Sequence, residues 1–343
     1  MEGDLRRIAA APLPWESLRD ASVIVSGAAG FIPACLIELL LHLNEERDLR
    51  VRVTGLVRDA RRATSRFGAQ RPGLILLEQD LSCALSPEVA ARPADIVIHA
   101  ASPASPARFG PDPVGTLLPN VVGTHHLLEL ARERGARGFL FVSSSEVYGR
   151  VPPEALPLRE SFAGGELDPL APRSCYAEAK RMGETMCAAW RRQHGVPAVI
   201  VRPFHVYGPG MPLRDGRVFS DFVADIVERR PLTMRGDGTA VRSFCYLADA
   251  VAGCFTALLA GAPGEAYNVG HPGAVASVRE LAARLVALFP ARGLSIERAA
   301  PPPGALPSPV ARLTPDIAKL GARGWAPALG LEEGFRRTVE SFA

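Results

Sequence analysis

The stretch Ala21-Ser22-Val23-Ile24-Val25-Ser26-Gly27-Ala28-Ala29-Gly30-Phe31-Ile32-Pro33 decides the fold of this chain. It opens with an apolar run typical of a buried strand, and a second apolar run continues behind the glycines to Leu43 in a helical pattern. A strand, a glycine turn and a helix in this order are the context in which a glycine pair indicates a dinucleotide-binding site. The alternative is an ordinary strand-to-helix turn that carries two glycines by chance.

Each residue of this turn has its own part in binding a dinucleotide. Gly27 permits the tight turn, and Gly30 lets the backbone approach a ligand closely. Phe31 and Ile32 begin the helix, whose first N–H groups have no partner within it and therefore face the pyrophosphate. Pro33 stands where a third glycine is usual, and proline is tolerated in the first turn of a helix. We therefore expect the fold to persist.

Strand and helix patterns alternate along the chain. The strand patterns lie at residues 51–57, 74–77, 96–99, 139–142 and 198–201, and the helical patterns at 116–134 and 176–194. This alternation predicts an α/β fold with a Rossmann-type, doubly wound parallel sheet. The later segments must fold over the strand ends, and we expect them to form a smaller, discontinuous C-terminal substrate-binding domain. The predicted limits are 21–205 and 241–273 for the dinucleotide-binding domain, 206–240 and 274–343 for the substrate-binding domain, and 1–20 for an N-terminal extension with one short helix.

Ligands of a doubly wound sheet bind beyond the carboxyl ends of its strands. The strand at 51–57 ends in Arg58 and Asp59; an arginine here takes the 2′-phosphate of NADP, whereas an acidic residue takes the ribose hydroxyls of NAD. We predict NAD, with NADP left open by Arg58. The other cofactor contacts expected at the strand ends are Asp80 and Leu81 near the adenine, and Ala100, Ser102, Asn120 and Pro203.

Tyr176 and Lys180 are four residues apart at the start of a helical pattern, so their side chains share one helix face. A nearby ammonium favours the phenolate and lowers a tyrosine pKa from its usual ~10, which would let Tyr176 remove a proton from a substrate hydroxyl. The chain has only one other lysine, Lys319, so a lysine here indicates a need for a compact ammonium. A tyrosine and a lysine on a solvated helix face are the alternative.

Polar and basic residues accompany this pair. The strand at 139–142 delivers Ser144, Ser145 and Glu146 to the same edge of the sheet. Arginines that cover such a site indicate an anionic substrate, for example a nucleotide sugar, although they can also be generic surface charge. The arginines concerned are Arg217, Arg235, Arg242 and Arg312.

Composition excludes several other functions. A net charge of +3 over 343 residues, without a long basic run, gives no reason to expect nucleic acid or a membrane surface as a partner. The six cysteines show no disulfide or metal-ligand spacing, so we expect reduced thiols and no metal. The N-terminus has no apolar signal core, and the predicted location is the cytoplasm.

Longer strings of sequence carry a family resemblance. Gly27-x-x-Gly30, Ser143-Ser144-Ser145-Glu146, Tyr176-x-x-x-Lys180 and Arg202-Pro203-Phe204 resemble the extended short-chain dehydrogenase/reductase family, whose members act on nucleotide sugars. Within it, the chain is most similar to the UDP-glucuronate decarboxylase (UDP-xylose synthase) group. The strings behind this likeness include Ala101-Ser102-Pro103-Ala104-Ser105-Pro106, Pro172-Arg173-Ser174-Cys175-Tyr176, Asp215-Gly216-Arg217-Val218 and Arg312-Leu313-Thr314-Pro315-Asp316.

The resemblance implies a retained nicotinamide and a catalytic set. Tyr176, aided by Lys180 and Ser144, would remove the C4 hydroxyl proton of the sugar while hydride passes to the cofactor, and Glu146 with Ser145 would assist at C5. It also implies a UDP-linked substrate and a homodimer that pairs through the helices at 116–134 and 176–194. The residues implied in substrate binding are Ser105, Arg173, His205, Arg217, Arg235, Arg242 and Arg312.

Other functions stay open at this point. Glu146 favours chemistry at C5, either decarboxylation or epimerisation, whereas Ser145 stands where a dehydratase usually has an acid. His205 replaces an asparagine of the decarboxylases, and Arg58 and Pro33 also depart from their pattern. A 4- or 5-epimerase or a dehydratase-like relative is therefore the second hypothesis. A non-catalytic cofactor sensor is a third.

Overall fold

The computed structural model describes residues 2–68, 70–300, 306, 308 and 310–342. Its centre is a seven-stranded sheet in the order β11-β6-β5-β4-β1-β2-β3, with every pairing parallel. The strands are β1 (Ser22–Ser26), β2 (Arg52–Val57), β3 (Leu74–Glu78), β4 (Ile96–His99), β5 (Gly138–Val142), β6 (Ala198–Pro203) and β11 (Ala266–Val269). The predicted parallel sheet is confirmed, and β11 is a strand that the sequence patterns did not reveal.

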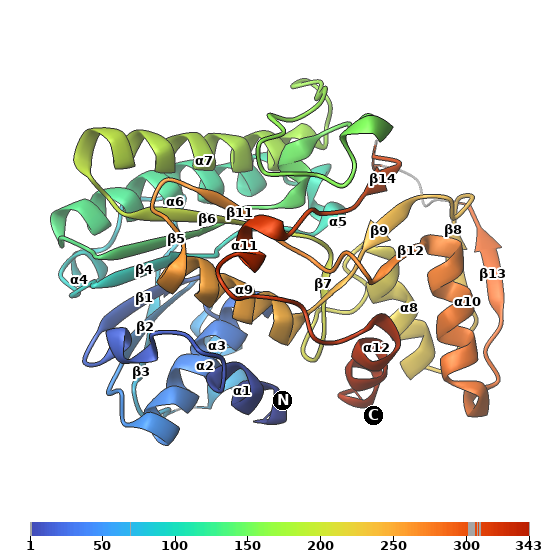
Figure 1. Ribbon diagram of the computed structural model, residues 1–343, viewed down its shortest axis with the longest axis horizontal. Coiled ribbons are helices and arrows are strands. Elements are labelled where there is room, and N and C mark those ends of the chain that lie inside the picture. The colour runs from blue at the N-terminus through green and yellow to red at the C-terminus, as the bar shows by residue number, and fades with distance from the viewer. Residues whose placement is uncertain (1, 69, 301–305, 307, 309, 343) are drawn as a thin grey trace.

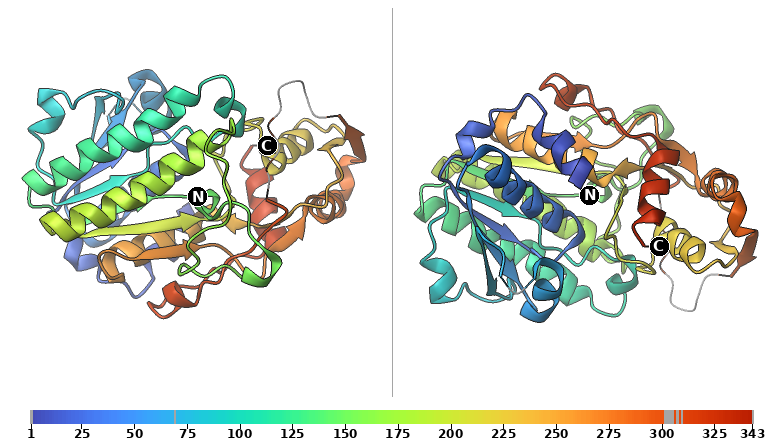
Figure 2. Two further views of the ribbon diagram at one scale, coloured as in Figure 1. Left: turned by 90° about the horizontal axis from the view of Figure 1, so that it is seen from above. Right: turned by 90° about the horizontal axis from the view of Figure 1, so that it is seen from below.

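Helices cover both faces of this sheet (Figure 1). On one face, α6 (Pro113–Glu133) and α7 (Ser174–His194) lie side by side, as the left view of Figure 2 shows. On the other face lie α2 (Phe31–Arg47) and α9 (Leu247–Ala260), with α1 (Glu2–Ala9) packed against both. β1 is buried along its whole length because helices cover both faces, which explains its unbroken apolar sequence.

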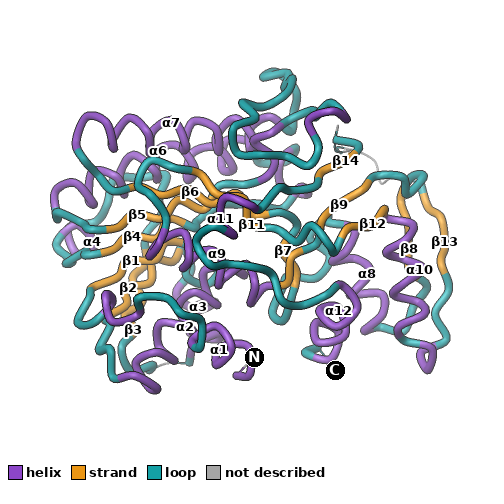
Figure 3. Tube along the Cα trace, viewed as in Figure 1, coloured by secondary structure: helices purple, strands orange, loops and turns teal. Residues whose placement is uncertain are grey.

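A smaller lobe stands at one end of the sheet, at the right of Figures 1 and 3. Its helices are α8 (Val218–Val227), α10 (Val278–Leu288) and α12 (Leu331–Glu340). β8 (Leu232–Arg235) pairs with β13 (Ile296–Ala299), β9 (Val241–Ser243) lies between β12 (Val275–Ser277) and β14 (Arg312–Leu313), and β7 (Val206–Tyr207) pairs with β10 (Cys245–Tyr246). The lobe is thus built from segments on either side of α9. The predicted limits of the two domains remain a prediction.

The remaining elements are short. They are α3 (Ala60–Phe67), α4 (Pro87–Ala90), α5 (Pro106–Phe109), α11 (Ala318–Gly321), and the 3-10 turns η1 (Trp15–Leu18), η2 (Ser145–Tyr148), η3 (Pro153–Ala155) and η4 (Pro290–Arg292). Within the described residues, no helix combines the length and the apolar character that crossing a bilayer requires.

The N-terminal extension is packed into the molecule. Its short helix, α1, buries Leu5 and Ile8 in the main core. Arg7 pairs with the buried carboxylate of Asp249 in α9 at 2.7 Å, and Asp4 pairs with Arg337 of α12 at 3.0 Å. α1 therefore ties the first residues of the chain to two C-terminal helices.

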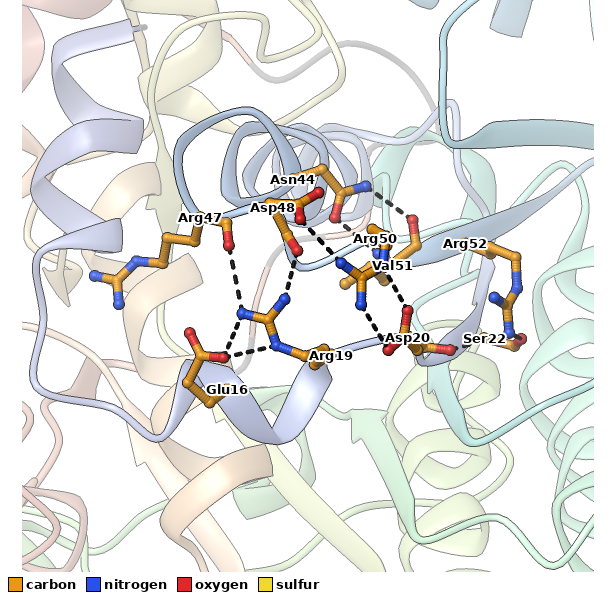
Figure 4. Close-up of polar contacts among 10 residues, drawn as sticks. All are labelled: Glu16, Arg19, Asp20, Ser22, Asn44, Arg47, Asp48, Arg50, Val51 and Arg52. Carbon is orange, nitrogen blue, oxygen red and sulfur yellow. Dashed lines mark hydrogen bonds and ion pairs between the residues drawn. The ribbon is translucent and has the colours of Figure 1, made fainter.

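A second polar cluster, shown in Figure 4, fixes the end of this extension. Arg19 pairs with Glu16 and donates a hydrogen bond to the carbonyl of Asp48, at the end of α2, at 2.7 Å. The last carbonyls of a helix lack partners within it, so the guanidinium satisfies one of them. Arg50 pairs with Asp20 at 2.8 Å beside it. The cluster lies at the amino ends of β1 and β2, away from the predicted site.

Candidate active site

The glycine turn after β1 has the geometry that a close ligand requires. Gly27 has a φ of +72°, and a Cβ there would stand 2.7 Å from the Cα of Ala101. A side chain at this position would collide with the backbone of the loop after β4. Gly30 precedes α2 and gives it no side-chain cap. The backbone is therefore open to a ligand at the start of this helix.

The first turn of α2 leaves two amides for such a ligand. The amide of Gly30 bonds to the carbonyl of Gly27 at 2.7 Å, and the amide of Ala34 bonds back to the carbonyl of Gly30 at 3.1 Å. Pro33 has no N–H and is buried within the helix. Phe31 and Ile32 thus supply the first-turn donors that a pyrophosphate can take.

The ends of β2 and β3 bring further predicted cofactor residues to this edge. Arg58 and Asp59 are exposed between β2 and α3. Asp80 is exposed and accepts a hydrogen bond from the amide of Ser82 at 2.8 Å. Leu81 is buried beneath it. Their contacts with a cofactor remain predictions.

Two buried polar atoms near this edge have no hydrogen-bond partner among the described residues. They are the Oγ of Ser102 and the Oδ1 of Asn120, whose Nδ2 donates to the carbonyl of Thr116 at 2.7 Å. Buried polar atoms in folded proteins are nearly always paired, so both fit a site completed by a ligand. Ala100 lies beside Ser102, and Pro203 is buried at the end of β6. With the glycine turn, these residues fit a dinucleotide.

Tyr176 and Lys180 lie in α7 and point into the interior. Tyr176 is 7% exposed, and its ring stacks on that of Phe109 with 5.0 Å between centroids and 14° between planes. Lys180 is 1% exposed, and its Nζ donates to the carbonyl of Val142 at 2.7 Å. This Nζ lies 5.9 Å from the centroid of the Tyr176 ring. The solvated-face alternative for the pair is therefore wrong.

Burial changes the acidity of both groups. Burial raises the pKa of Tyr176 to about 12. The charge of Glu146 also raises this pKa, whereas the Ser144 hydroxyl and the Arg217 guanidinium lower it. Burial lowers the pKa of Lys180 to about 7, against the charge of Glu184. The prediction that the lysine lowers the tyrosine pKa is wrong for this structure, because loss of hydration disfavours the charged form of each group.

The serines after β5 begin a short 3-10 turn. Ser144 caps this turn, and its Oγ accepts a hydrogen bond from the amide of Glu146 at 3.1 Å. Ser145 is buried, whereas the Glu146 side chain is 30% exposed and pairs with Arg173 at 3.5 Å. The predicted catalytic residues thus lie together at the carboxyl end of β5.

Three of the predicted substrate residues lie close to one another. Arg242 is buried and donates to the carbonyl of Val310 at 2.7 Å, and burial lowers its pKa. Arg217 pairs with Asp215 at 2.8 Å. The pKa of His205 lies well below its usual value because of burial and then the charges of Arg242 and Arg217. These residues form a basic corner next to Glu146.

The other predicted substrate residues have different surroundings. The Oγ of Ser105 donates to the carbonyl of Asp215 at 2.5 Å, which joins the loop after β4 to the smaller lobe. Arg235 is 43% exposed and paired with Asp221 at 2.6 Å. Arg312 is exposed in β14, beside the strand that carries Arg242. Their substrate roles remain predictions.

Two residues of the site were not predicted. Phe109 stacks its ring on that of Tyr176, and the guanidinium carbon of Arg173 lies 5.5 Å from its centroid. The carbonyl of Leu306 accepts a hydrogen bond from Arg173 at 2.7 Å. Neither residue type carries a recognisable chemical signal, and Leu306 is far from the site in sequence.

Fold and site together define a class of dinucleotide-binding enzymes with a tyrosine, lysine and serine at the sheet edge. The model of the NAD dependent epimerase/dehydratase family matches residues 23–270. The chain belongs to this family, and the predicted use of NAD agrees with it.

Curated relatives extend over nearly the whole chain. UDP-glucuronic acid decarboxylase 3 of Arabidopsis thaliana is 36% identical over 322 residues, which cover 93% of this chain and 88% of the relative. UDP-glucuronic acid decarboxylase 1 of Xenopus tropicalis is 34% identical over 333 residues, covering 96% and 74%. Among solved structures, the UDP-glucose 4-epimerase of Thermus thermophilus in complex with NAD has a TM-score of 0.76 and 28% identity, covering 94% of this chain and 98% of that one.

Proposed function

We propose that this protein converts UDP-glucuronate to UDP-xylose and carbon dioxide with a nicotinamide cofactor that it retains. The position of Glu146 carries the proposal: it lies in the turn at the carboxyl end of β5 and pairs at 3.5 Å with Arg173, three residues before Tyr176. A group that acts at C5 is thereby held beside the base that acts at C4. The decarboxylase names of the relatives support the same reaction.

Each residue has a defined task in this reaction. Tyr176, with Ser144 beside it, takes the proton of the C4 hydroxyl and later returns it. The glycine turn at Gly27 and the amides of Phe31 and Ile32 would hold NAD, which would supply hydride transfer from C4 and back to it. The 4-keto uronate is a β-keto acid, so the C5–C6 bond breaks, carbon dioxide leaves, and the electron pair moves into the carbonyl. Glu146, with Ser145, assists protonation at C5.

The reaction is tested by the mass of the product. Incubation of the purified protein with UDP-glucuronate is expected to give a nucleotide sugar that is lighter by one carbon dioxide. Mass spectrometry of the product measures this difference. UDP-glucose, which has no carboxylate, serves as the control and should give no such loss. A product of unchanged mass would instead identify an epimerase and overturn the proposed decarboxylation.

We also propose that the protein is a homodimer joined through α6 and α7. Exposed apolar side chains on these helices support this pairing: Met182 is 49% exposed and Leu117 is 38% exposed. The double variant Leu117→Glu/Met182→Glu is expected to elute as a monomer in size exclusion with light scattering, whereas Ile75→Glu, at a 46% exposed position of β3, should remain dimeric. A monomeric wild-type protein would contradict the proposal.

We infer a cytoplasmic location. All six cysteines lie within the described part of the chain and are free thiols, and four of them are buried. Persistent free thiols fit a reducing compartment.

A further inference from the structure

Arg173, at the start of α7, has contacts on every side of its guanidinium except one. Its Nη1 donates to the carbonyl of Leu306 at 2.7 Å, and its Nη2 lies 3.5 Å from an oxygen of Glu146. The guanidinium carbon lies 5.5 Å from the ring centroid of Phe109. Its Nε is buried and has no hydrogen-bond partner within the described residues. The side chain is 15% exposed, so little water reaches it.

The free edge of this guanidinium has the shape of a carboxylate site. The Nε–H and one Nη2–H of an arginine point the same way and form a fork that holds both oxygens of a carboxylate. In Arg173 the Nε is unpartnered among the described residues and the Nη2 has only a long contact, while the Nη1 is fixed by Leu306. A buried donor without a partner is destabilising, so the fork fits an acceptor from outside the chain. Arg173 also lines a cavity of 270 Å³, together with Glu146 and Ala177.

We propose that the fork of Arg173 binds the carboxylate of the sugar and thereby selects an acidic nucleotide sugar over its neutral counterpart. This assignment rests on the proposed function, which supplies the carboxylate. Phe109 contacts both Arg173 and Tyr176, and the two residues stand three positions apart at the start of α7, so the fork and the C4 base are neighbours. The substrate needs this arrangement, because its carboxylate is attached to C5, next to C4.

Glu146 gives this contact a consequence for the reaction. A bound carboxylate shares Arg173 with Glu146, which brings two negative charges close together. The repulsion between them disappears when the carboxylate leaves as neutral carbon dioxide. The same pair of residues thus holds the acidic group and favours its departure.

Binding measurements test the selection. They use Tyr176→Phe protein, so that the ligands are not consumed, and titrate it calorimetrically with UDP-glucuronate and with UDP-glucose. Adding Arg173→Gln is expected to weaken UDP-glucuronate binding about 10- to 100-fold, the value of a charge-assisted contact, and to leave UDP-glucose binding within about threefold. Arg192→Gln is the matched control, because Arg192 is exposed in the last turn of the same helix, α7, and it should change neither affinity.

Several outcomes would overturn the assignment. Equal losses for both ligands would mean that Arg173 only maintains the structure, and unchanged discrimination would mean that another group recognises the carboxylate. Should Arg173→Gln fail to fold, Arg173→Lys keeps the charge without the fork and should still lose about tenfold for UDP-glucuronate alone. If the wild-type protein forms UDP-xylose but Arg173→Gln retains the discrimination, the assignment alone fails. If the Tyr176→Phe protein with Arg173 intact binds both ligands equally, both the assignment of Arg173 and the proposed substrate are wrong.

Discussion

Replacing Tyr176 by phenylalanine is expected to lower kcat about 10²- to 10⁴-fold, the usual contribution of a positioned acid–base group. The change removes one oxygen and keeps the ring that stacks on Phe109. The fold and the affinity for the nucleotide sugar should therefore persist. Single-turnover formation of reduced nicotinamide, followed by its absorbance, should fall by the same factor because the first step needs the base.

A second buried tyrosine provides the control. Tyr148 is 1% exposed, its hydroxyl donates to Asn268 at 2.6 Å, and burial raises its pKa to about 12, as for Tyr176. Tyr148→Phe should cost stability but keep kcat within about tenfold of wild type, because only Tyr176 is assigned to the chemistry. Turnover that survives in Tyr176→Phe would remove the tyrosine from the mechanism.

Replacing Lys180 by methionine is expected to make the protein more stable at pH 6. Lys180 is 1% exposed, and its ammonium donates a hydrogen bond to the carbonyl of Val142. A buried ammonium is costly, and a methionine of similar length removes this cost. The charge of Lys180 thus lowers the stability of the folded protein at this pH.

The gain in stability should depend on pH in a defined direction. Burial lowers the pKa of Lys180 to about 7 in the folded protein, against ~10.4 for an unfolded lysine. Between these values the unfolded chain binds one more proton, so the wild-type free energy of unfolding rises with pH by about 1.4 kcal/mol per unit. The advantage of Lys180→Met should therefore shrink by about 2–3 kcal/mol between pH 7 and pH 9.

Urea unfolding of both proteins at several pH values measures this difference. Lys319→Met is the matched control, because Lys319 is the chain's other lysine, its side chain is 34% exposed, and it pairs with Glu265 on the surface. Its stability difference from wild type should not change across this window. A pH-independent gain in Lys180→Met would mean that Lys180 has an ordinary pKa in the folded protein.

Local patterns in the sequence were sufficient for the sheet. The strand before Gly27 was recognisable because a strand buried on both faces has an unbroken apolar sequence, and β1 has helices on both sides. The short strand β11 escaped prediction because it has only four residues, Ala266–Val269, and Asn268 interrupts its apolar run. The packing of the N-terminal extension was hidden for a different reason, since Asp4 and Arg7 have their partners far away in the sequence, in α12 and α9.

The sequence by itself determined that a glycine turn, a serine-bearing strand end and a Tyr-x-x-x-Lys helix meet at one sheet edge, because strand and helix patterns are local and parallel strands end at the same edge. Only the tertiary structure decided how acidic these groups are, since burial sets the pKa of Tyr176 and of Lys180 in directions that residue spacing does not reveal. It also decided that Arg173 contacts Glu146, Phe109 and Leu306, while its Nε has no hydrogen-bond partner among the described residues. Those partners come from three separate parts of the chain, and their meeting depends on packing that no single stretch of sequence encodes.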